Sequence, residues 1–95
     1  MYRKKRFLVC YDVSINKIRT KIQKKLTAYG IRIQYSNYLC EFFPKELSET
    51  RKFCENILGK KDTLIWIPMS DSLLEKIYFQ GKIEVFEEKP KANIF

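Results

Sequence analysis

The chain opens with a short apolar run, Phe7 to Tyr11, which stops abruptly at the acid Asp12. An unbroken aliphatic and aromatic run of this length is typical of a strand that is covered on both faces. We therefore predict a buried strand from Lys5 to Tyr11. An acid that ends such a strand just before a helix lies at the carboxyl edge of the sheet, which is where open α/β sheets bind ligands. The pattern makes Asp12 the first candidate for function.

A basic segment with helical periodicity follows, between Ser14 and Tyr29. Its apolar residues recur at spacings of three and four, which places them on one helix face; they are Ile15, Ile18, Ile22, Leu26 and Tyr29. Ser14 is expected to cap the amino end, and Gly30 is expected to end the helix in the left-handed conformation.

The other faces of this helix are basic throughout and carry no acid; their charged residues are Lys17, Arg19, Lys21, Lys24 and Lys25. An exposed helix normally mixes charge signs, because pairs of opposite charge four residues apart stabilise it. The unmixed charge favours contact with phosphates over a face that is merely solvated.

As far as Met69, the pattern predicts three more strands and a second helix. Alternation over 31–36 and over 38–43 has opposite phases, which indicates a bulge or a tight turn near Ser36-Asn37. Pro44 suits the first turn of a helix over about 45–58. A further buried strand is predicted from Asp62 to Met69, stopped by Pro68.

Beyond this strand, Ser70 is expected to cap a short turn that runs to Leu74. On either side of Gly81, alternation over Lys76–Gln80 and Lys82–Phe86 predicts two short strands or one bent strand. The tail, residues 87–95, is polar but ends in two apolar residues, so it is either a frayed end or a docking segment for another chain.

The element order predicts an α+β, ferredoxin-like domain over residues 1–86, with βαββαβ topology and an extra C-terminal strand. Two helices would cover one face of the sheet. A chain of 95 residues buries only a thin core. We therefore expect a second copy to cover the bare face, as a sheet-to-sheet homodimer.

Charge is divided unevenly along the chain. Residues 1–40 hold ten Lys or Arg against one acid, for +9, whereas residues 41–95 hold nine basic and ten acidic residues, for −1. A basic half of this kind is typical of proteins that bind a polyanion, and nucleic acid is favoured over a membrane surface because the basic helix has no broad apolar face. No apolar run approaches the roughly 20 residues that span a bilayer, and none fits a secretory signal, so we expect a cytoplasmic protein.

The composition excludes several kinds of catalysis. There is no histidine, which removes Ser-His and Cys-His nucleophiles and histidine-bound zinc. Cys10, Cys40 and Cys54 form no C-x-x-C pair and lie within apolar patterns, so buried free thiols are predicted. A hydrolase with this composition would depend on carboxylates, a hard metal ion, Lys, Arg, Tyr or Ser.

Asp12 has two interpretations. It could be an Asx-type cap or a partner for Lys17 or Arg19, or it could be a ligand of magnesium, which often takes one or two carboxylates and keeps several waters. Tyr35 and Tyr38, with Tyr11 nearby, also have two interpretations, because these rings could stack on bases or pack in the core or a dimer interface.

The run from Phe7 to Ser14, the helix that closes on Tyr29-Gly30 and the stretch from Arg32 to Ser36 together resemble the Cas-two family. That family is the smaller of the two core CRISPR adaptation proteins. The resemblance continues through Ile67-Pro68 and into residues 77–81, and so covers nearly the whole chain.

The resemblance implies a ferredoxin-like homodimer in which Asp12 of each protomer lies at the interface and can share Mg²⁺ or another divalent cation. Family members are described as metal-dependent nucleases acting on RNA or double-stranded DNA, and as the scaffold between integrase dimers during spacer acquisition. Asp12 would then be both catalytic and metal-binding. Supporting roles are implied for three residues, Tyr11, Ser36 and Tyr38. Nucleic-acid contacts are expected from Lys17, Arg19, Lys21, Lys24, Lys25 and Arg32.

Three positions depart from the family pattern. Lys21 stands where arginine is usual, Tyr38 where phenylalanine is usual and Asn37 where a small apolar residue is usual. Lysine keeps the charge but loses the bidentate fork of arginine. Two other functions stay open on this fold: a toxin-type ribonuclease and an RNA-binding module without catalysis.

Overall fold

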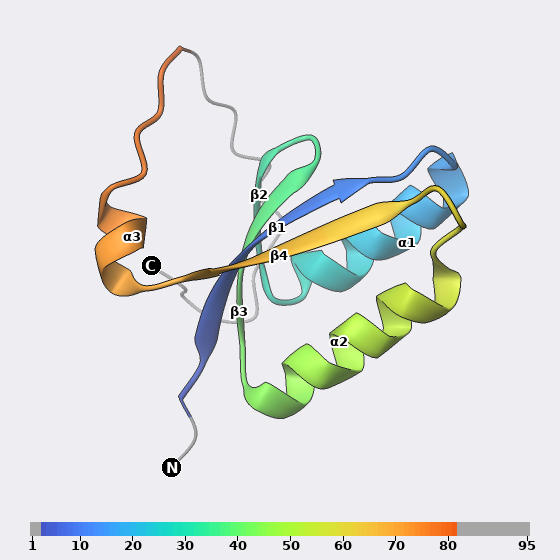
Figure 1. Ribbon diagram of the computed structural model, residues 1–95, viewed down its shortest axis with the longest axis horizontal. Helices are drawn as coiled ribbons and strands as arrows, with labels where there is room; N and C mark the ends of the chain where they lie inside the picture. Colours follow the sequence, from blue (N-terminus) through green and yellow to red (C-terminus); the bar gives the residue numbers. More distant parts are fainter. Residues whose placement is uncertain (1–2, 82–95) are drawn as a thin grey trace.

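The computed structural model describes residues 3–81. Four strands form one antiparallel sheet in the order β2-β3-β1-β4, and α1 and α2 lie on one side of it (Figure 1). This is the α+β, ferredoxin-like arrangement predicted from the sequence. The elements are β1 (Lys5–Asp12), α1 (Asn16–Thr27), β2 (Gly30–Gln34), β3 (Asn37–Phe42), α2 (Pro44–Ile57), β4 (Thr63–Met69) and a short α3 (Asp71–Glu75).

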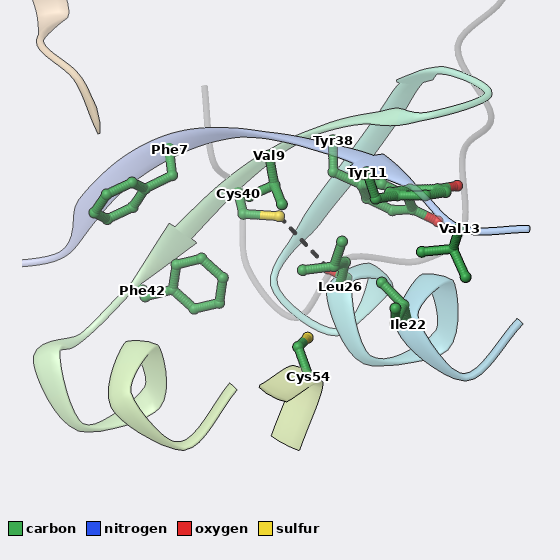
Figure 2. Packing of buried hydrophobic residues seen from close by; sticks show 10 residues of the cluster. All are labelled: Phe7, Val9, Tyr11, Val13, Ile22, Leu26, Tyr38, Cys40, Phe42 and Cys54. Atoms are coloured by element: carbon green, nitrogen blue, oxygen red, sulfur yellow. Dashed lines mark hydrogen bonds between the residues drawn. The ribbon is translucent and has the colours of Figure 1, made fainter. Parts of the chain in front are cut away.

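The core lies between the sheet and the two long helices (Figure 2). Alternate residues of β1 and β3 face these helices, and Val9 and Phe42 are completely buried there. Ile22 and Leu26 of α1 and Cys54 of α2 close the core from the helix side. The helical periodicity of the apolar residues therefore places them as predicted, with the exception of Ile15, which is 54% exposed.

The opposite side of the sheet, called the open face here, carries the intervening residues of the same strands. Leu8 and Cys10 of β1 pair with Ile67 and Ile65 of β4. Ile65 is 56% exposed and Ile67 is 39% exposed. The prediction that β1 and β4 are covered on both faces is therefore wrong for a single protomer, because α1 and α2 lie on one side only.

Gly30 and Ser14 have roles other than the predicted caps. Gly30 lies within β2 and is not left-handed; a Cβ atom there would stand 2.0 Å from the Leu39 carbonyl oxygen, so the close approach of β3 requires glycine. Ser14 does not cap α1, since Ile15 occupies the N-cap position and makes no side-chain capping bond. The tight turn predicted near Ser36-Asn37 is confirmed, because β2 and β3 meet in a turn at residues 35–36 with an irregularity between Arg32 and Gln34.

The region after β4 is partly as predicted. Ser70 caps α3 by accepting a hydrogen bond from the Leu73 amide at 3.1 Å. Pro68 does not stop β4, because this strand has a free edge among the described strands and tolerates a missing N–H. No strand forms over residues 76–80, since the Lys76 amide bonds back to the Leu73 carbonyl and prolongs the turn. The predicted strand 82–86 and the tail 87–95 lie outside the described residues.

Candidate functional site

Asp12 is the last residue of β1 and stands opposite Thr63 of β4. Its position alternates with the core residues of β1, so it belongs to the open face, and it is exposed. Within residues 3–81 no hydrogen bond or ion pair engages its carboxylate. Neither the Asx-type cap nor the pairing with Lys17 or Arg19 is therefore present.

The loop that follows Asp12 is held by other residues. The Arg19 guanidinium donates to the Val13 carbonyl and to Asn16 Oδ1, both at 2.9 Å. The Asp62 carboxylate accepts from the Gly59 amide at 2.8 Å and, more weakly, from the Ser14 amide at 3.4 Å. Asp62 is therefore bonded to backbone amides, whereas no hydrogen bond or ion pair engages the Asp12 carboxylate within residues 3–81.

Tyr11 is buried and belongs to a hydrogen-bonded network. Its hydroxyl donates to the Tyr35 carbonyl and accepts from Gln23 Nε2 at 2.7 Å. Thr27 donates to the Gln23 carbonyl at 2.7 Å and lies 3.1 Å from the Tyr38 hydroxyl, so the Tyr38 hydroxyl is the donor in that pair. For Tyr11 and Tyr38 the core interpretation is confirmed, since they are 4% and 3% exposed.

The turn between β2 and β3 lies next to the end of β1. The Tyr11 amide donates to the Ser36 carbonyl at 2.9 Å, and Asn37 Nδ2 donates to Gln34 Oε1 at 2.6 Å. Tyr35 is 73% exposed at the tip of this turn. The Arg32 guanidinium carbon lies 5.8 Å from the centre of the Tyr35 ring. The sequence pattern grouped Tyr35 with Tyr38, whereas the structure separates an exposed ring from a buried one.

Three lysines of α1 form a line on its exposed surface, which we call the lysine stripe: Lys17, Lys21 and Lys24. Their spacing of four and three residues puts them on one helix face, over roughly 10 Å of helix length. No acid lies in α1. Lys25 departs from the stripe, since it is half-buried with its ammonium 5.1 Å from the Phe53 ring centre. Arg19 is occupied by the loop described above.

The cysteines offer no nucleophile. Burial raises the pKa of Cys54 to about 11, and it also raises the pKa values of Cys40 and Cys10. At neutral pH the thiolate is therefore scarce. Cys54 does line a cleft of about 450 Å³ between α2 and β4, together with Arg51 and Trp66. There the Arg51 guanidinium carbon lies 5.2 Å from the Trp66 ring centre, so these two side chains pack against each other in the wall of the cleft.

The described residues contain no group of three or more His, Cys, Asp or Glu that could enclose a metal ion. At the end of β1, each protomer presents the Asp12 carboxylate, which has no hydrogen bond or ion pair within residues 3–81. Its oxygen atoms suit a hard cation such as Mg²⁺, which accepts few protein ligands and retains waters. The residues therefore fit a shared or water-rich site and do not fit an enclosed one.

The fold and this site define a class: a ferredoxin-like α+β protein with a lysine-lined helix and an unpaired aspartate at the end of an inner strand. No helix in the part of the chain that the structure describes is long and apolar enough to cross a membrane. The family model for CRISPR associated protein Cas2 matches residues 5–77. The chain belongs to the Cas2 family.

Relatives support this assignment. CRISPR-associated endoribonuclease Cas2 1 of Methanospirillum hungatei JF-1 is 34% identical over 96 residues, which cover 94% of this chain and 90% of that protein. CRISPR-associated endoribonuclease Cas2 3 of Synechocystis sp. is 27% identical over 77 residues, covering 80% of this chain and 84% of that protein.

Solved structures share the fold. A hypothetical protein of Thermus thermophilus aligns with a TM-score of 0.75 at 24% identity, covering 85% of this chain and 95% of that chain. Cas2 of Streptococcus pyogenes, solved at pH 6.5, aligns with a TM-score of 0.74 at 23% identity, covering 80% of this chain and 99% of that chain.

Proposed function

We propose that this chain is a CRISPR adaptation subunit that binds nucleic acid as a two-fold homodimer, and that it cleaves phosphodiesters of RNA or double-stranded DNA with Mg²⁺ at Asp12. Membership of the Cas2 family supports the CRISPR role, and the curated relatives are named endoribonucleases. An integrase subunit is the further partner that we propose.

The observation that carries this proposal is the position of Asp12 on the open face. This exposed acid shares that face with the exposed side chains of Ile65 and Ile67. A second copy that covered these isoleucines would bury apolar surface, and each Å² removed from water would stabilise the dimer by roughly 25 cal/mol. In a two-fold interface both protomers use the same surface, so an aspartate from each copy would belong to it.

Two carboxylates are what the metal proposal requires. Asp12 and the same residue of a second copy would hold Mg²⁺, which when bound supplies an activated water and neutralises charge on the phosphodiester. The chain's own contribution is to present the carboxylate on a rigid inner strand. Arg19 and Asp62 keep the neighbouring loop in place without using the Asp12 oxygens.

The lysine stripe would bind the phosphate backbone. It spans roughly 10 Å of helix, and one strand of duplex DNA carries a phosphate about every 3.4 Å of its axis, so the stripe matches about three phosphates. Contacts of this kind carry no sequence information and weaken as salt rises.

The metal-dependent activity is tested with Asp12→Asn, which keeps the shape and removes the charge. We expect Mg²⁺-dependent cleavage of labelled structured RNA or duplex DNA to fall by at least about 100-fold, since even outer partners of a metal site often contribute 10- to 100-fold. Asp71→Asn is the matched control, because Asp71 is an exposed carboxylate in α3. Calorimetric titration with Mg²⁺ alone should lose its binding signal in the first variant only.

Other results would redirect the proposal. Equal cleavage by Asp12→Asn and the wild type would show that Asp12 is not the catalytic carboxylate. If nothing cleaves and duplex still binds, the protein is a scaffold without catalysis. If only RNA is cleaved and no duplex binds, the toxin-type ribonuclease becomes the better hypothesis. Replacing Lys17, Lys21 and Lys24 with glutamate should abolish duplex binding, and intact binding would contradict the stripe.

A further inference from the structure

We infer that the turn between α2 and β4, residues 59–62, is a second phosphate-binding element, which holds the nucleic-acid backbone next to Asp12. We call it the lysine turn, because Lys60 and Lys61 are its two central residues. This inference rests on the proposed nucleic-acid binding and adds a contact surface outside α1. The evidence is the exposure of the two lysines, the hydrogen bonds that fix their backbone and the position of the turn at the end of β1.

The two lysines of the turn are exposed and have no acidic partner. The chain reverses between Gly59 and Asp62, where the Asp62 amide donates to the Gly59 carbonyl at 3.2 Å. Lys60 and Lys61 lie at the tip of this turn, and within residues 3–81 no hydrogen bond or ion pair engages either ammonium group. Two adjacent cations that no carboxylate of the protein neutralises attract an external polyanion, and a nucleic-acid backbone offers them successive phosphates.

The Asp62 side chain fixes the shape of the turn. Its Oδ2 atom accepts from the Gly59 amide at 2.8 Å, and its Oδ1 atom accepts more weakly from the Ser14 amide at 3.4 Å. The acid that follows the two lysines in the sequence is therefore bonded to backbone amides and not to their ammonium groups. Because the backbone of the turn is already fixed, a bound phosphate does not have to order it, and less of the binding energy is lost.

The lysine turn lies beside Asp12. Thr63 follows the turn directly and is the partner of Asp12 in the register of β1 and β4. The Cα atoms of antiparallel partners are about 4.5–5.5 Å apart, so the turn is close to the end of β1. Ser14, whose amide bonds to Asp62, leads into α1, and Figure 1 shows the turn next to the start of this helix. A phosphate backbone that contacts both Lys17, in the first turn of α1, and the lysine turn would therefore pass the end of β1.

The test measures the affinity for a fluorescently labelled blunt DNA duplex, and for an RNA hairpin, over a range of salt concentrations. The double variant Lys60→Gln, Lys61→Gln should weaken duplex binding at 0.1 M salt by at least about 8-fold, because counterion release contributes roughly this factor for each phosphate contact. Its slope of log affinity against log salt concentration should become shallower by about 0.9 for each lysine that contacts a phosphate. The matched control is Lys45→Gln, Lys52→Gln, which removes the same charge from exposed lysines of α2 and should leave the slope unchanged.

Asp62 provides a second test, whose expected result is opposite to that of a simple charge effect. Asp62→Ala raises the net charge by one but removes both bonds that fix the turn, so it should weaken duplex binding by about 5- to 30-fold, the cost of ordering one backbone residue. Asp62→Asn raises the charge equally and keeps an oxygen for the Gly59 amide, so it should bind at least as tightly as the wild type. Circular dichroism checks that both variants are folded, and if Asp62→Ala is unfolded, the lysine variants decide.

The outcomes separate this inference from the proposed function. If the lysine-turn variant and the α2 control weaken binding equally, only net charge matters, and the inference is wrong while the proposed function stands. If Asp62→Ala and Asp62→Asn both bind the duplex more tightly than the wild type, the turn does not hold its lysines against the backbone, and the inference is also wrong. If the wild type binds neither the duplex nor the hairpin, the proposed function fails together with the inference.

Discussion

The two faces of the sheet are built from the same strands and differ in almost every physical property. On the helix-covered face, Val9 and Phe42 are completely buried. On the open face, the neighbouring rows of the same sheet expose Ile65 and Ile67. One face therefore supplies the folding stability of the protomer, and the other exposes apolar side chains of β4.

Polar chemistry is divided in the same way. The buried tyrosine Tyr11 faces the helices and is bonded to Gln23 and to the Tyr35 backbone. Asp12, one residue further along β1, belongs to the open face and has no such partner within residues 3–81. Buried polar groups must be paired, whereas a ligand needs a group that is not. The helix-covered face therefore stabilises the fold, and the open face is the one on which we propose that a ligand binds.

The largest effects, on stability and on oligomeric state, are expected from replacing one large apolar residue on each face. Phe42→Ala should lower the free energy of unfolding by about 3–5 kcal/mol, because it leaves a cavity in the core. Ile67→Asp should leave the protomer folded, since Ile67 is 39% exposed, and should convert a dimer to a monomer. Urea unfolding followed by circular dichroism measures the first effect, and light scattering coupled to gel filtration measures the second.

A particular pair of results would contradict this division of roles. If Ile67→Asp unfolds the protein as strongly as Phe42→Ala, the open face belongs to the folding core. If Ile67→Asp leaves the oligomeric state unchanged, the open face is not the dimer surface.

A smaller effect is expected from replacing two threonines beneath the helix-covered face with valine. The two replacements should change the free energy of unfolding in opposite directions. Thr50 is completely buried in α2, and its hydroxyl has no hydrogen-bond partner among the described residues, so Thr50→Val should raise the free energy of unfolding by about 1 kcal/mol. The Thr27 hydroxyl bonds both the Gln23 carbonyl and Tyr38, so Thr27→Val should lower it by about 1–2 kcal/mol. Urea unfolding of both variants under the same conditions checks the pair, and equal signs would show that Thr50 has a partner.

The sequence predicted the sheet, the two long helices and the place of Asp12, because these depend on local patterns. The apolar run that ends at Asp12 and the spacing of Ile22 and Leu26 are visible without any tertiary contact. The dimer, the metal and the nucleic-acid contacts stay predictions, since the structure holds one protomer without ligands.

What the sequence did not reveal depends on contacts between distant segments. Gly30 matches the pattern of a helix cap, but only the approach of β3 at Leu39 shows why a side chain is excluded there. Arg19 looks like any basic residue on α1 until the Val13 carbonyl is found beside it. Tyr35 and Tyr38 are three residues apart, and their separation into exposed and buried rings depends on where the hairpin turns.

A further effect, confined to alkaline pH, is expected from two thiols, Cys54 under the helix-covered face and Cys10 on the open face. Burial raises the pKa of Cys54 in the folded protein to about 11, compared with an ordinary thiol value near 9. Above pH 9 the unfolded chain loses this proton while the folded chain keeps it, so the free energy of unfolding falls as pH rises from about 9 to about 11. The slope from one thiol is at most about 1.4 kcal/mol per pH unit.

Cys54→Ala removes this contribution. Its free energy of unfolding should be lower than that of the wild type at pH 8, because a buried side chain is truncated, but should fall less steeply between pH 9 and pH 11. Cys10→Ser is the control on the open face, where the thiol is half-buried and the same change should alter the slope less. Urea unfolding of the three proteins at each pH measures how steeply the free energy of unfolding falls. The titration of lysines and tyrosines contributes equally to all three slopes, because all three proteins share these residues. Identical slopes for Cys54→Ala and the wild type would mean that burial does not raise the pKa of the Cys54 thiol. A larger change of slope in Cys10→Ser than in Cys54→Ala would mean that the Cys10 thiol is the more strongly desolvated of the two.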